Sequence, residues 1–268
     1  ALMGMRPIPD LQYSDFIFEC MDEIVNQAAK IRYMSGGKLK VPLVLRCPVG
    51  TANRGAQHGQ SPESYFIHVP GIKVVCPSDA YVAKGIIKSA IRDDDPVLVF
   101  EHKLLYGSKG RESAGGMDLT AEVPEEEYLF PIGKALKKRN GTSLTIISTH
   151  LTLYRCLAAA EELAAEGIDC EVIDPVSLLP LDTETIYESV NKTKKALIAH
   201  EDTFTGGWGA EVAALISQNC FYDLKTPVQR IAAYDVPLPV TPVLKQAVVP
   251  SVERIKEKIR QLHKMGKS

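Results

Sequence analysis

The chain has 268 residues, of which 45% are hydrophobic and 24% charged, a composition typical of a folded globular protein. This length exceeds what one small core needs and suits two α/β domains. The formal net charge of −2 creates no global positive field, which argues against nucleic acid and an anionic membrane as partners.

Six cysteines are scattered singly along the chain, and no CxxC pair occurs. Disulfide frameworks and zinc sites normally show tighter spacing, so we expect reduced and mostly buried thiols. No apolar run reaches the roughly 18 residues that a membrane-spanning helix needs, and no signal sequence is visible. These features favour the cytoplasm, or the mitochondrial matrix or a plastid in a eukaryote whose targeting peptide has been removed.

Short runs rich in β-branched residues alternate with stretches of helical periodicity, which is typical of parallel sheets flanked by helices. The expected strands cover residues 6–12, 41–45, 73–76, 97–101, 143–149, 170–173, 196–200 and 229–233. The expected helices cover residues 16–33, 79–92, 151–166, 182–191, 209–220 and 251–264. Ser78 or Asp79 suits the N-cap of the second helix, and the proline-flanked segment 175–180 is expected to be a loop.

Glycines, a proline and an acidic run interrupt this alternation between residues 109 and 127. We interpret the interruption as an extended crossing between two domains; the alternative is a surface loop within one domain. The predicted fold class is α/β, with two domains that each contain a largely parallel sheet flanked by helices. The expected domains are residues 1–115 and 131–268, and residues 116–130 are the expected linker.

The densest cluster of candidate functional residues is RCPVGTANRGAQHGQSP, at residues 46–62. It follows an expected strand, and loops at the carboxyl ends of parallel strands are where α/β proteins bind ligands. His58 lies in this loop, and histidine side chains exchange protons near neutral pH, so it is a candidate catalytic residue. The alternative is a loop histidine that makes one structural hydrogen bond.

A second candidate follows the expected strand at 196–200. His200-Glu201-Asp202 precedes a glycine-rich run that leads into a helix start, where an anion could bind. The spacing matches neither a Rossmann motif nor a P-loop, so a loop that packs against the neighbouring domain is the alternative. Trp208, the only tryptophan, would suit a partner interface.

Asp93-Asp94-Asp95 before Pro96 raises the question of a divalent metal site. Adjacent carboxylates seldom converge on one ion, so a solvated turn is the better interpretation, although its carbonyls could hold a monovalent cation. The remaining histidines are interpreted as structural or surface residues; they are His68, His102, His150 and His263. No GxSxG, HExxH or GxxxxGK[ST] motif occurs.

Several segments carry a joint resemblance to one family. They are RPI at 6–8, DF at 15–16, DEIVNQAAK at 22–30, YMSGG at 33–37, QHGQSPE at 57–63, PGIKVVCP at 70–77, AKG at 83–85, IRDDDP at 91–96, residues 101–106, HE at 200–201 and residues 206–211. Together they resemble the beta subunit of the decarboxylating component of thiamine-diphosphate-dependent 2-oxo acid dehydrogenases, in the transketolase-like superfamily. The resemblance extends over essentially the whole chain.

The resemblance implies a pyrimidine-binding domain followed by a transketolase C-terminal-type domain. It implies an α2β2 heterotetramer with an alpha subunit and a second beta chain, and thiamine diphosphate at the interface with the alpha subunit. In this family the alpha subunit holds the diphosphate and Mg²⁺ through a GDG motif, and no GDG occurs here. The implied reaction is oxidative decarboxylation of a 2-oxo acid, or cleavage of acetoin, with transfer of the acyl group to a lipoyl-bearing acyltransferase core.

The resemblance also assigns roles to single residues. It places Phe16 against the aminopyrimidine ring of the cofactor, and His58 near the reacting carbon, where it assists proton transfer or acylation of the lipoyl group. It further implies a structural K⁺ bound mostly through backbone carbonyls, and the residues concerned are Leu43, Ala90, Ile91, Asp93 and Asp95.

One departure concerns the Glu that activates the cofactor in the family, which lies upstream of Arg6 in a strand–helix segment that this sequence does not contain. The sequence also has no start methionine, so we expect it to be N-terminally incomplete and to support little or no turnover as it stands. Two other functions stay open. One is a transketolase-type half enzyme, and the other is a non-catalytic assembly subunit that keeps the interface.

The substrate stays open as well. Residues 77–79, 93–95 and 101–103 are more similar to the acetoin type, whereas residues 58–63 are more similar to the branched-chain type. These two indications conflict, and pyruvate also remains a candidate.

Overall fold

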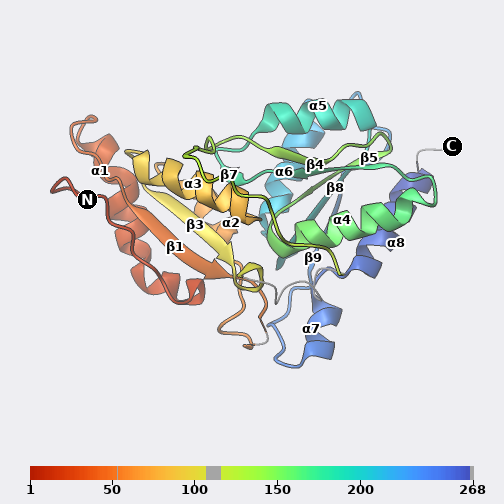
Figure 1. The fold of residues 1–268 in the computed structure, drawn as a ribbon, viewed down its shortest axis with the longest axis horizontal. Helices are drawn as coiled ribbons and strands as arrows, with labels where there is room; N and C mark the ends of the chain where they lie inside the picture. Colours follow the sequence, from red (N-terminus) through yellow and green to blue (C-terminus); the bar gives the residue numbers. More distant parts are fainter. Residues whose placement is uncertain (53, 107–115, 266–268) are drawn as a thin grey trace.

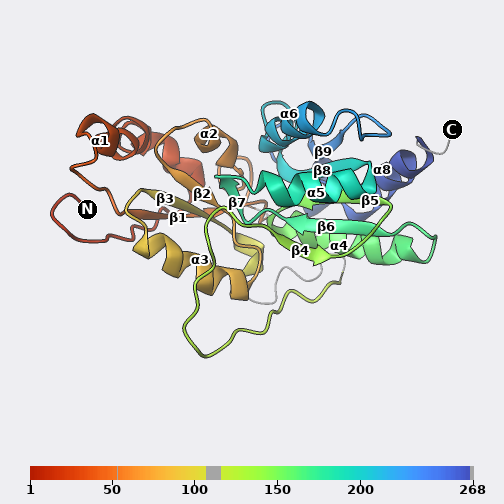
Figure 2. The ribbon, with the colours of Figure 1, turned by 90° about the horizontal axis from the view of Figure 1, so that it is seen from above.

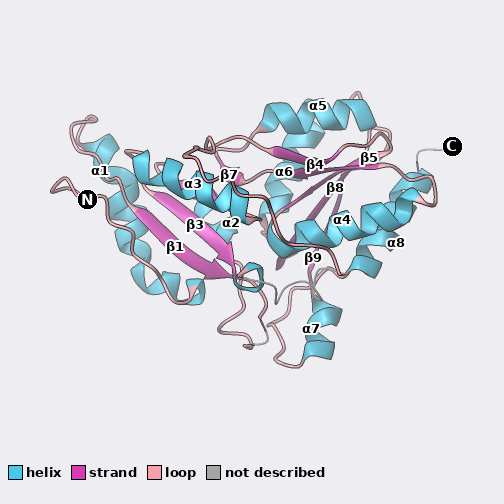
Figure 3. Cartoon of the chain, in the orientation of Figure 1, coloured by secondary structure: helices cyan, strands magenta, loops and turns pink. Residues whose placement is uncertain are grey.

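The structure is a computed structural model, and it describes residues 1–52, 54–106 and 116–265. Two sheets lie side by side, one built mainly from the first half of the chain and the other from the second half (Figure 1). Helices cover the faces of both sheets (Figure 3). The predicted α/β class, with two largely parallel sheets flanked by helices, is confirmed.

The first sheet has the strand order β1-β3-β2-β7. Strands β1 (Val44–Val49), β2 (Lys73–Val75) and β3 (Val97–His102) run parallel to one another. Every residue of β3 is buried, as expected for a central parallel strand covered on both faces. The expected strand at residues 6–12 runs along β1 with backbone hydrogen bonds but forms only an isolated bridge.

The fourth strand of this sheet comes from the second half of the chain. Strand β7 (Ser177–Leu179) pairs antiparallel with β2, so the prediction of a loop at residues 175–180 was wrong. A strand of three residues is too short to show an alternating pattern in the sequence, and it forms here because it pairs with β2.

Helices of the first half lie on both faces of this sheet. In Figure 2, α3 lies on one face, and α1 and α2 lie on the other. Asp79 caps α3 as predicted, since its side chain accepts a hydrogen bond from the Val82 amide at 2.7 Å. The elements are the 3₁₀ helices η1 (Ser14–Cys20) and η3 (Lys103–Leu105), the π-helix η2 (Glu23–Ala28), and α1 (Ala29–Met34), α2 (Glu63–Ile67) and α3 (Ala80–Arg92).

The second sheet has the order β4-β6-β5-β8-β9, and only the β4·β6 pair is antiparallel. Its strands are β4 (Leu136–Arg139), β5 (Leu144–Ser148), β6 (Cys170–Asp174), β8 (Ala196–Thr203) and β9 (Gln229–Ala233). Its helices are α4 (His150–Ala164), α5 (Thr183–Thr193), α6 (Trp208–Asn219), α7 (Pro242–Val248) and α8 (Val252–Met265). The short elements α2, β4 and α7 were not predicted.

Alternating residues of the second sheet serve two different cores, because successive side chains of a strand point to opposite faces. Ile146 of β5 joins the cluster under α4 and α8, which includes Leu163 and Ile259. Its neighbour Ile147 points the other way, toward α5 and α6.

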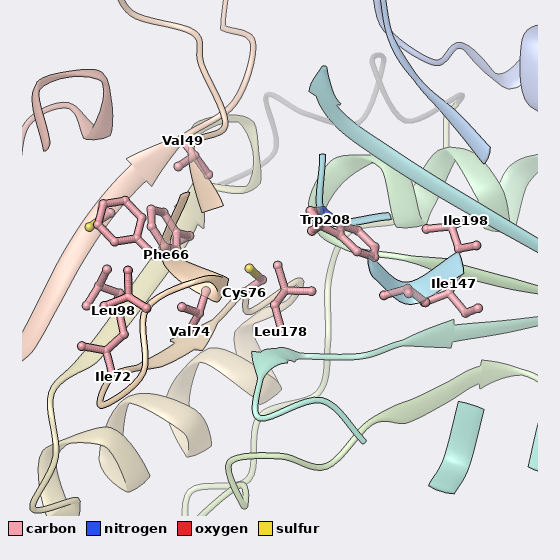
Figure 4. Packing of buried hydrophobic residues seen from close by; sticks show 14 of the residues in the cluster. Val49, Phe66, Ile72, Val74, Cys76, Leu98, Ile147, Leu178, Ile198 and Trp208 are labelled. Atoms are coloured by element: carbon pink, nitrogen blue, oxygen red, sulfur yellow. The ribbon is translucent and has the colours of Figure 1, made fainter. Parts of the chain in front are cut away.

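The second of these cores continues into the first sheet. Val74 and Leu98 of the first sheet share one buried cluster with Ile198 of the second, and Leu178 and Trp208 belong to the same cluster (Figure 4). Trp208 is only 2% exposed, so its expected place at a partner interface was wrong. A tryptophan in this position gives the two halves a common apolar core.

Residues 109–115 of the predicted crossing at 109–127 lie outside the described residues, and residues 116–135 contain no helix or strand. The predicted boundaries at residues 115 and 131 stay a prediction, because β7 returns to the first sheet. Among the described helices, none has both the length and the apolar character to cross a membrane.

We expect Leu178→Ala to lower the free energy of unfolding by about 2–4 kcal/mol, because it opens a cavity in the core that both halves share. Hydrogen exchange should then increase in both sheets. Leu163→Ala, in the core under α4 and α8, serves as the matched control and should loosen the second sheet alone. Chemical denaturation combined with hydrogen exchange measures both effects, and loosening by Leu178→Ala in one sheet only would contradict the shared core.

Candidate active site

His58 lies in the segment that connects the end of β1 with α2. Its ring meets Phe16 edge-on at 5.4 Å between centroids, and meets Tyr13 in the same way at 5.8 Å. Phe16 belongs to η1 and remains 38% exposed. The structure therefore brings together the two residues that the sequence singled out, and we call Tyr13, Phe16 and His58 the aromatic wall.

The aromatic wall has the features of one side of a site for a planar heterocycle. An exposed aromatic face suits such a ring, and the neighbouring imidazole can exchange protons. Next to Phe16, Asp15 is buried, and its Oδ1 accepts a hydrogen bond from the Gln60 amide at 2.9 Å. Its Oδ2 is buried without a hydrogen-bond partner among the described residues, which leaves an acceptor beside the wall.

Two cationic side chains lie beside the wall. The Lys103 ammonium donates a hydrogen bond to the His58 carbonyl at 2.7 Å and lies 4.7 Å from the centre of the Tyr13 ring. The Arg54 guanidinium lies 6.0 Å from the same centre. Burial lowers the pKa of Lys103, although Asp15 and Glu201 oppose the shift.

A buried carboxylate from the second half of the chain meets the same region. Glu201, in β8, accepts a hydrogen bond from the Thr51 amide at 2.5 Å on Oε1, and the same oxygen lies 3.1 Å from Nε2 of His102. Its other oxygen lies 3.4 Å from Arg155. Burial alone would raise the pKa of Glu201, but His102, Arg155 and the Thr51 amide hold it well below its usual range.

A second buried carboxyl group behaves in the opposite way. Burial, together with the neighbouring Asp202 and Glu201, raises the pKa of Glu63 to about 8. Its Oε1 lies 3.6 Å from Nδ1 of His150, and burial together with His102 lowers the pKa of His150 to about 3. At neutral pH this contact therefore joins a protonated acid and a neutral imidazole, and it is not an ion pair.

Cys76 completes this cluster, with its donor atom within 4.8 Å of those of Glu63 and His150. Burial raises the pKa of the Cys76 thiol well above its usual value, so none of the three groups is ionised at neutral pH. The other ring nitrogen of His150, Nε2, contacts the Phe100 carbonyl at 2.9 Å. We interpret the cluster as a neutral group packed between the two sheets.

The glycine-rich run after β8 has a packing explanation. A Cβ at Gly207 or Gly209 would come within 2.6 Å of the His200 ring, so the buried ring requires glycine at both positions. Burial and the nearby Arg230 lower the pKa of His200 to about 3, so the ring is neutral at pH 7. These glycines therefore need no bound anion to explain them.

The residues of the predicted K⁺ site gather around the Asp93–Asp95 turn. The Leu43 carbonyl accepts a hydrogen bond from the Val97 amide at 2.8 Å, and the Ala90 carbonyl accepts one from the Asp93 amide at 3.2 Å. Arg6 donates to the carbonyls of Ile91 and Asp93 at 2.9 and 2.7 Å. Each of these carbonyls has a second lone pair, and a K⁺ ion bound to them stays a prediction.

Salt bridges neutralise the three carboxylates of this turn. Lys73 contacts Asp93 and Asp95, Arg32 contacts Asp95, and Arg6 and Lys40 contact Asp94. The side chains are therefore occupied, which agrees with the interpretation that no divalent metal binds through them.

The sequence interpretation took His102 and His150 for structural or surface residues, and it did not place them at the junction of the two sheets. Both are buried between the sheets, 2% and 5% exposed. His102 ends β3, and His150 begins α4, two residues after the end of β5. Their position at strand ends was the available signal, since that edge of a parallel sheet gathers functional groups.

Two protein-family descriptions match the chain. "Transketolase, pyrimidine binding domain" matches residues 1–109, and "Transketolase, C-terminal domain" matches residues 133–255. Three relatives are similar over nearly the whole chain. The 2-oxoisovalerate dehydrogenase subunit beta of Bacillus subtilis is 41% identical, with 98% of this chain and 78% of the relative covered.

The acetoin:2,6-dichlorophenolindophenol oxidoreductase subunit beta of Cupriavidus necator is 41% identical, with 100% of this chain and 76% of the relative covered. The pyruvate dehydrogenase E1 component subunit beta of Rickettsia felis is 40% identical, with 98% and 77% covered. The chain belongs to this family of dehydrogenase beta subunits. Among solved structures, "Split gene transketolase, inactive beta4 tetramer" matches with a TM-score of 0.78 over 99% of this chain and 78% of that chain. At 21% identity, this last match shows the fold alone.

We expect Glu63→Gln to remove a pH-dependent loss of stability from this beta subunit. The folded pKa of about 8 lies above the ordinary value of 4.5. The protonated Glu63 carboxyl group therefore makes its full contribution to the free energy of unfolding below pH 4.5. That contribution is lost as the pH rises toward 8. Relative to wild type, the variant should gain roughly 3 kcal/mol between pH 5 and pH 8 in urea denaturation.

Glu171→Gln is the matched control for this measurement. Glu171 is equally buried, but Lys192, other hydrogen bonds and the Gly141 amide outweigh its burial and lower its pKa. Its substitution should therefore shift stability by the same amount at pH 5 and pH 8. Parallel pH profiles for wild type and Glu63→Gln would show that the Glu63 carboxyl is ionised in the folded protein.

Proposed function

We propose that this beta subunit acts in a thiamine-diphosphate-dependent oxidative decarboxylation of a 2-oxo acid, or in the cleavage of acetoin, with the acyl group passed to a lipoyl-bearing acyltransferase. The observation that carries the proposal is the contact between the exposed Phe16 ring and His58 at 5.4 Å. Family membership adds the reaction class. The compartment proposed is the cytoplasm, or the mitochondrial matrix or a plastid in a eukaryote.

Phe16 and His58 have separate roles in this proposal. The exposed face of Phe16 would hold the aminopyrimidine ring of the cofactor. When bound, thiamine diphosphate supplies the electron sink for the loss of carbon dioxide. His58, whose ring adjoins that face, would move a proton at its ring nitrogen during the reaction or during acylation of the lipoyl group.

The charged end of the cofactor would depend on an alpha subunit. The sequence contains no GDG motif for the diphosphate and Mg²⁺. Lys103, a cation beside the wall, is already bonded to the His58 carbonyl. As in the family that the sequence resembles, we propose a heterotetramer of two alpha and two beta chains, with the cofactor at the seam between the two kinds of subunit.

The substrate is proposed only as a class. Relatives named for 2-oxoisovalerate, acetoin and pyruvate are 40–41% identical to this chain, so identity does not rank the three. All three substrates carry a carbonyl group that the same cofactor chemistry can attack. The assay must therefore include each of them.

The deciding experiment combines this beta subunit with its alpha subunit and measures dye reduction with each substrate, with and without thiamine diphosphate. We expect turnover that requires the cofactor. His58→Ala should lower that turnover by about 100-fold or more, whereas His68→Ala, an exposed histidine after α2, should leave it unchanged.

Two outcomes would contradict the proposal. A complex that assembles with the alpha subunit but turns over none of the three substrates would favour an assembly subunit. Full turnover and full lipoyl acylation by His58→Ala would exclude a catalytic role for this residue.

A K⁺ ion at the Asp93–Asp95 turn is also proposed, on the carbonyls of Leu43, Ala90, Ile91, Asp93 and Asp95. Binding to the folded chain alone would stabilise it, so potassium chloride should raise the Tm by about 2–4 °C over sodium chloride at equal ionic strength. Choline chloride serves as the control for ionic strength. Equal Tm values in all three salts would contradict a K⁺ ion at this turn.

A further inference from the structure

The segment that carries His58 is held by residues far away in the sequence. We call residues 50–62 the His58 loop; the structure describes all of it except position 53. Its two ends are closed by a hydrogen bond from the Gly50 amide to the Gln60 carbonyl at 3.1 Å. Further contacts that fix the loop come from β8 of the second sheet, from the end of β3, and from Asp15 of η1, which accepts a hydrogen bond from the Gln60 amide.

Adjacent residues at the end of β8 hold both ends of this loop. Glu201 accepts a hydrogen bond from the Thr51 amide at 2.5 Å, at the start of the loop. Asp202 accepts one from the Ser64 hydroxyl, just beyond its other end. Because the two acids follow one another in a strand, a single element of the second half fixes the span of the loop.

Glu201 also acts on the loop through β3. Its Oε1 lies 3.1 Å from His102, and the His102 ring packs so tightly on Gly50 that a Cβ there would come within 2.1 Å of it. The next residue, Lys103, donates a hydrogen bond to the His58 carbonyl at 2.7 Å. One carboxylate oxygen is thus linked to the base of the loop directly and to His58 through His102 and Lys103.

We propose that Glu201 is a positioning residue that fixes His58 at the aromatic wall, by holding the Thr51 amide and the His102–Lys103 pair on one oxygen. The inference rests on the proposed catalytic role of His58. A carboxylate that only stabilises the junction would affect the whole fold, whereas a positioning residue affects the loop selectively.

Glu201→Gln tests this distinction, because the amide keeps the size of the side chain but loses the charge. In the complex with the alpha subunit we expect faster hydrogen exchange in residues 50–62. We also expect kcat to fall by about 10- to 100-fold with KM changed less than about threefold, since a misplaced group slows the chemical step. Glu171→Gln is the matched control: it also removes a buried carboxylate that accepts from a backbone amide and contacts a cation.

Lys103→Met provides a second variant in case Glu201→Gln folds poorly, because Lys103 lies at a partly exposed position. It should release the His58 carbonyl and accelerate exchange in the same loop. If both residues act through one linkage, the double variant should lose little more kcat than the worse single variant. If instead the fold-losses in kcat of the two single variants multiply in the double variant, the two residues do not act through one linkage.

The inference is overturned if Glu201→Gln accelerates exchange in the His58 loop no more than Glu171→Gln does, or if kcat stays at the wild-type level. Failure of the proposed function gives a different result, namely no cofactor-dependent turnover in the wild-type complex. Hydrogen exchange in the His58 loop can be measured whether or not the wild-type complex turns over substrate. It therefore shows whether Glu201 positions the loop even if the proposed function fails.

Discussion

The arrangement of this beta subunit depends on one buried carboxylate at the junction of its two sheets. An ionised group removed from water costs several kcal/mol unless cations and hydrogen-bond donors surround it. Glu201 meets this condition with the Thr51 amide, His102 and Arg155, which come from the loop after β1, the end of β3 and helix α4. Because each donor belongs to a different element, satisfying this charge fixes the three elements relative to one another.

The neighbouring Glu63 shows what the same degree of burial does without such donors. Glu63 meets a neutral His150 and lies near Asp202 and Glu201, so its proton stays on and its pKa rises. Two carboxyl groups in one junction thus have opposite charge states, because charges packed closely together in a poorly hydrated site cannot all persist. The ionised member is the one linked to the His58 loop, and the neutral one lies beneath the loop's far end.

Much of the fold could be predicted from the sequence, because its long elements carry strong patterns. The strands around Val97 and Leu144 and the helix capped by Asp79 were predicted within a few residues of where they lie. The sequence pattern did not predict short elements that form only by pairing with a strand distant in the sequence, such as β7 around Leu178. The same limit applies to the site: Phe16 and His58 were found through a family resemblance and a loop of unusual composition. By contrast, the place of His102 depends on a contact with Glu201, 99 residues away.

Glycine positions show how the same sequence signal acquires a different meaning once packing is known. In the sequence, the run around Gly207 resembled a possible anion site, because glycine-rich turns before helices often bind anions. In the structure, the approach of the His200 ring explains Gly207 and Gly209, just as the approach of His102 explains Gly50. All three glycines make room for a histidine, His200 within β8 or His102 at the end of β3, so each strand can bring a ring against the neighbouring backbone. At Gly50 that close contact lies directly at the base of the His58 loop, which is why packing at the junction and chemistry at the aromatic wall are not separable in this chain.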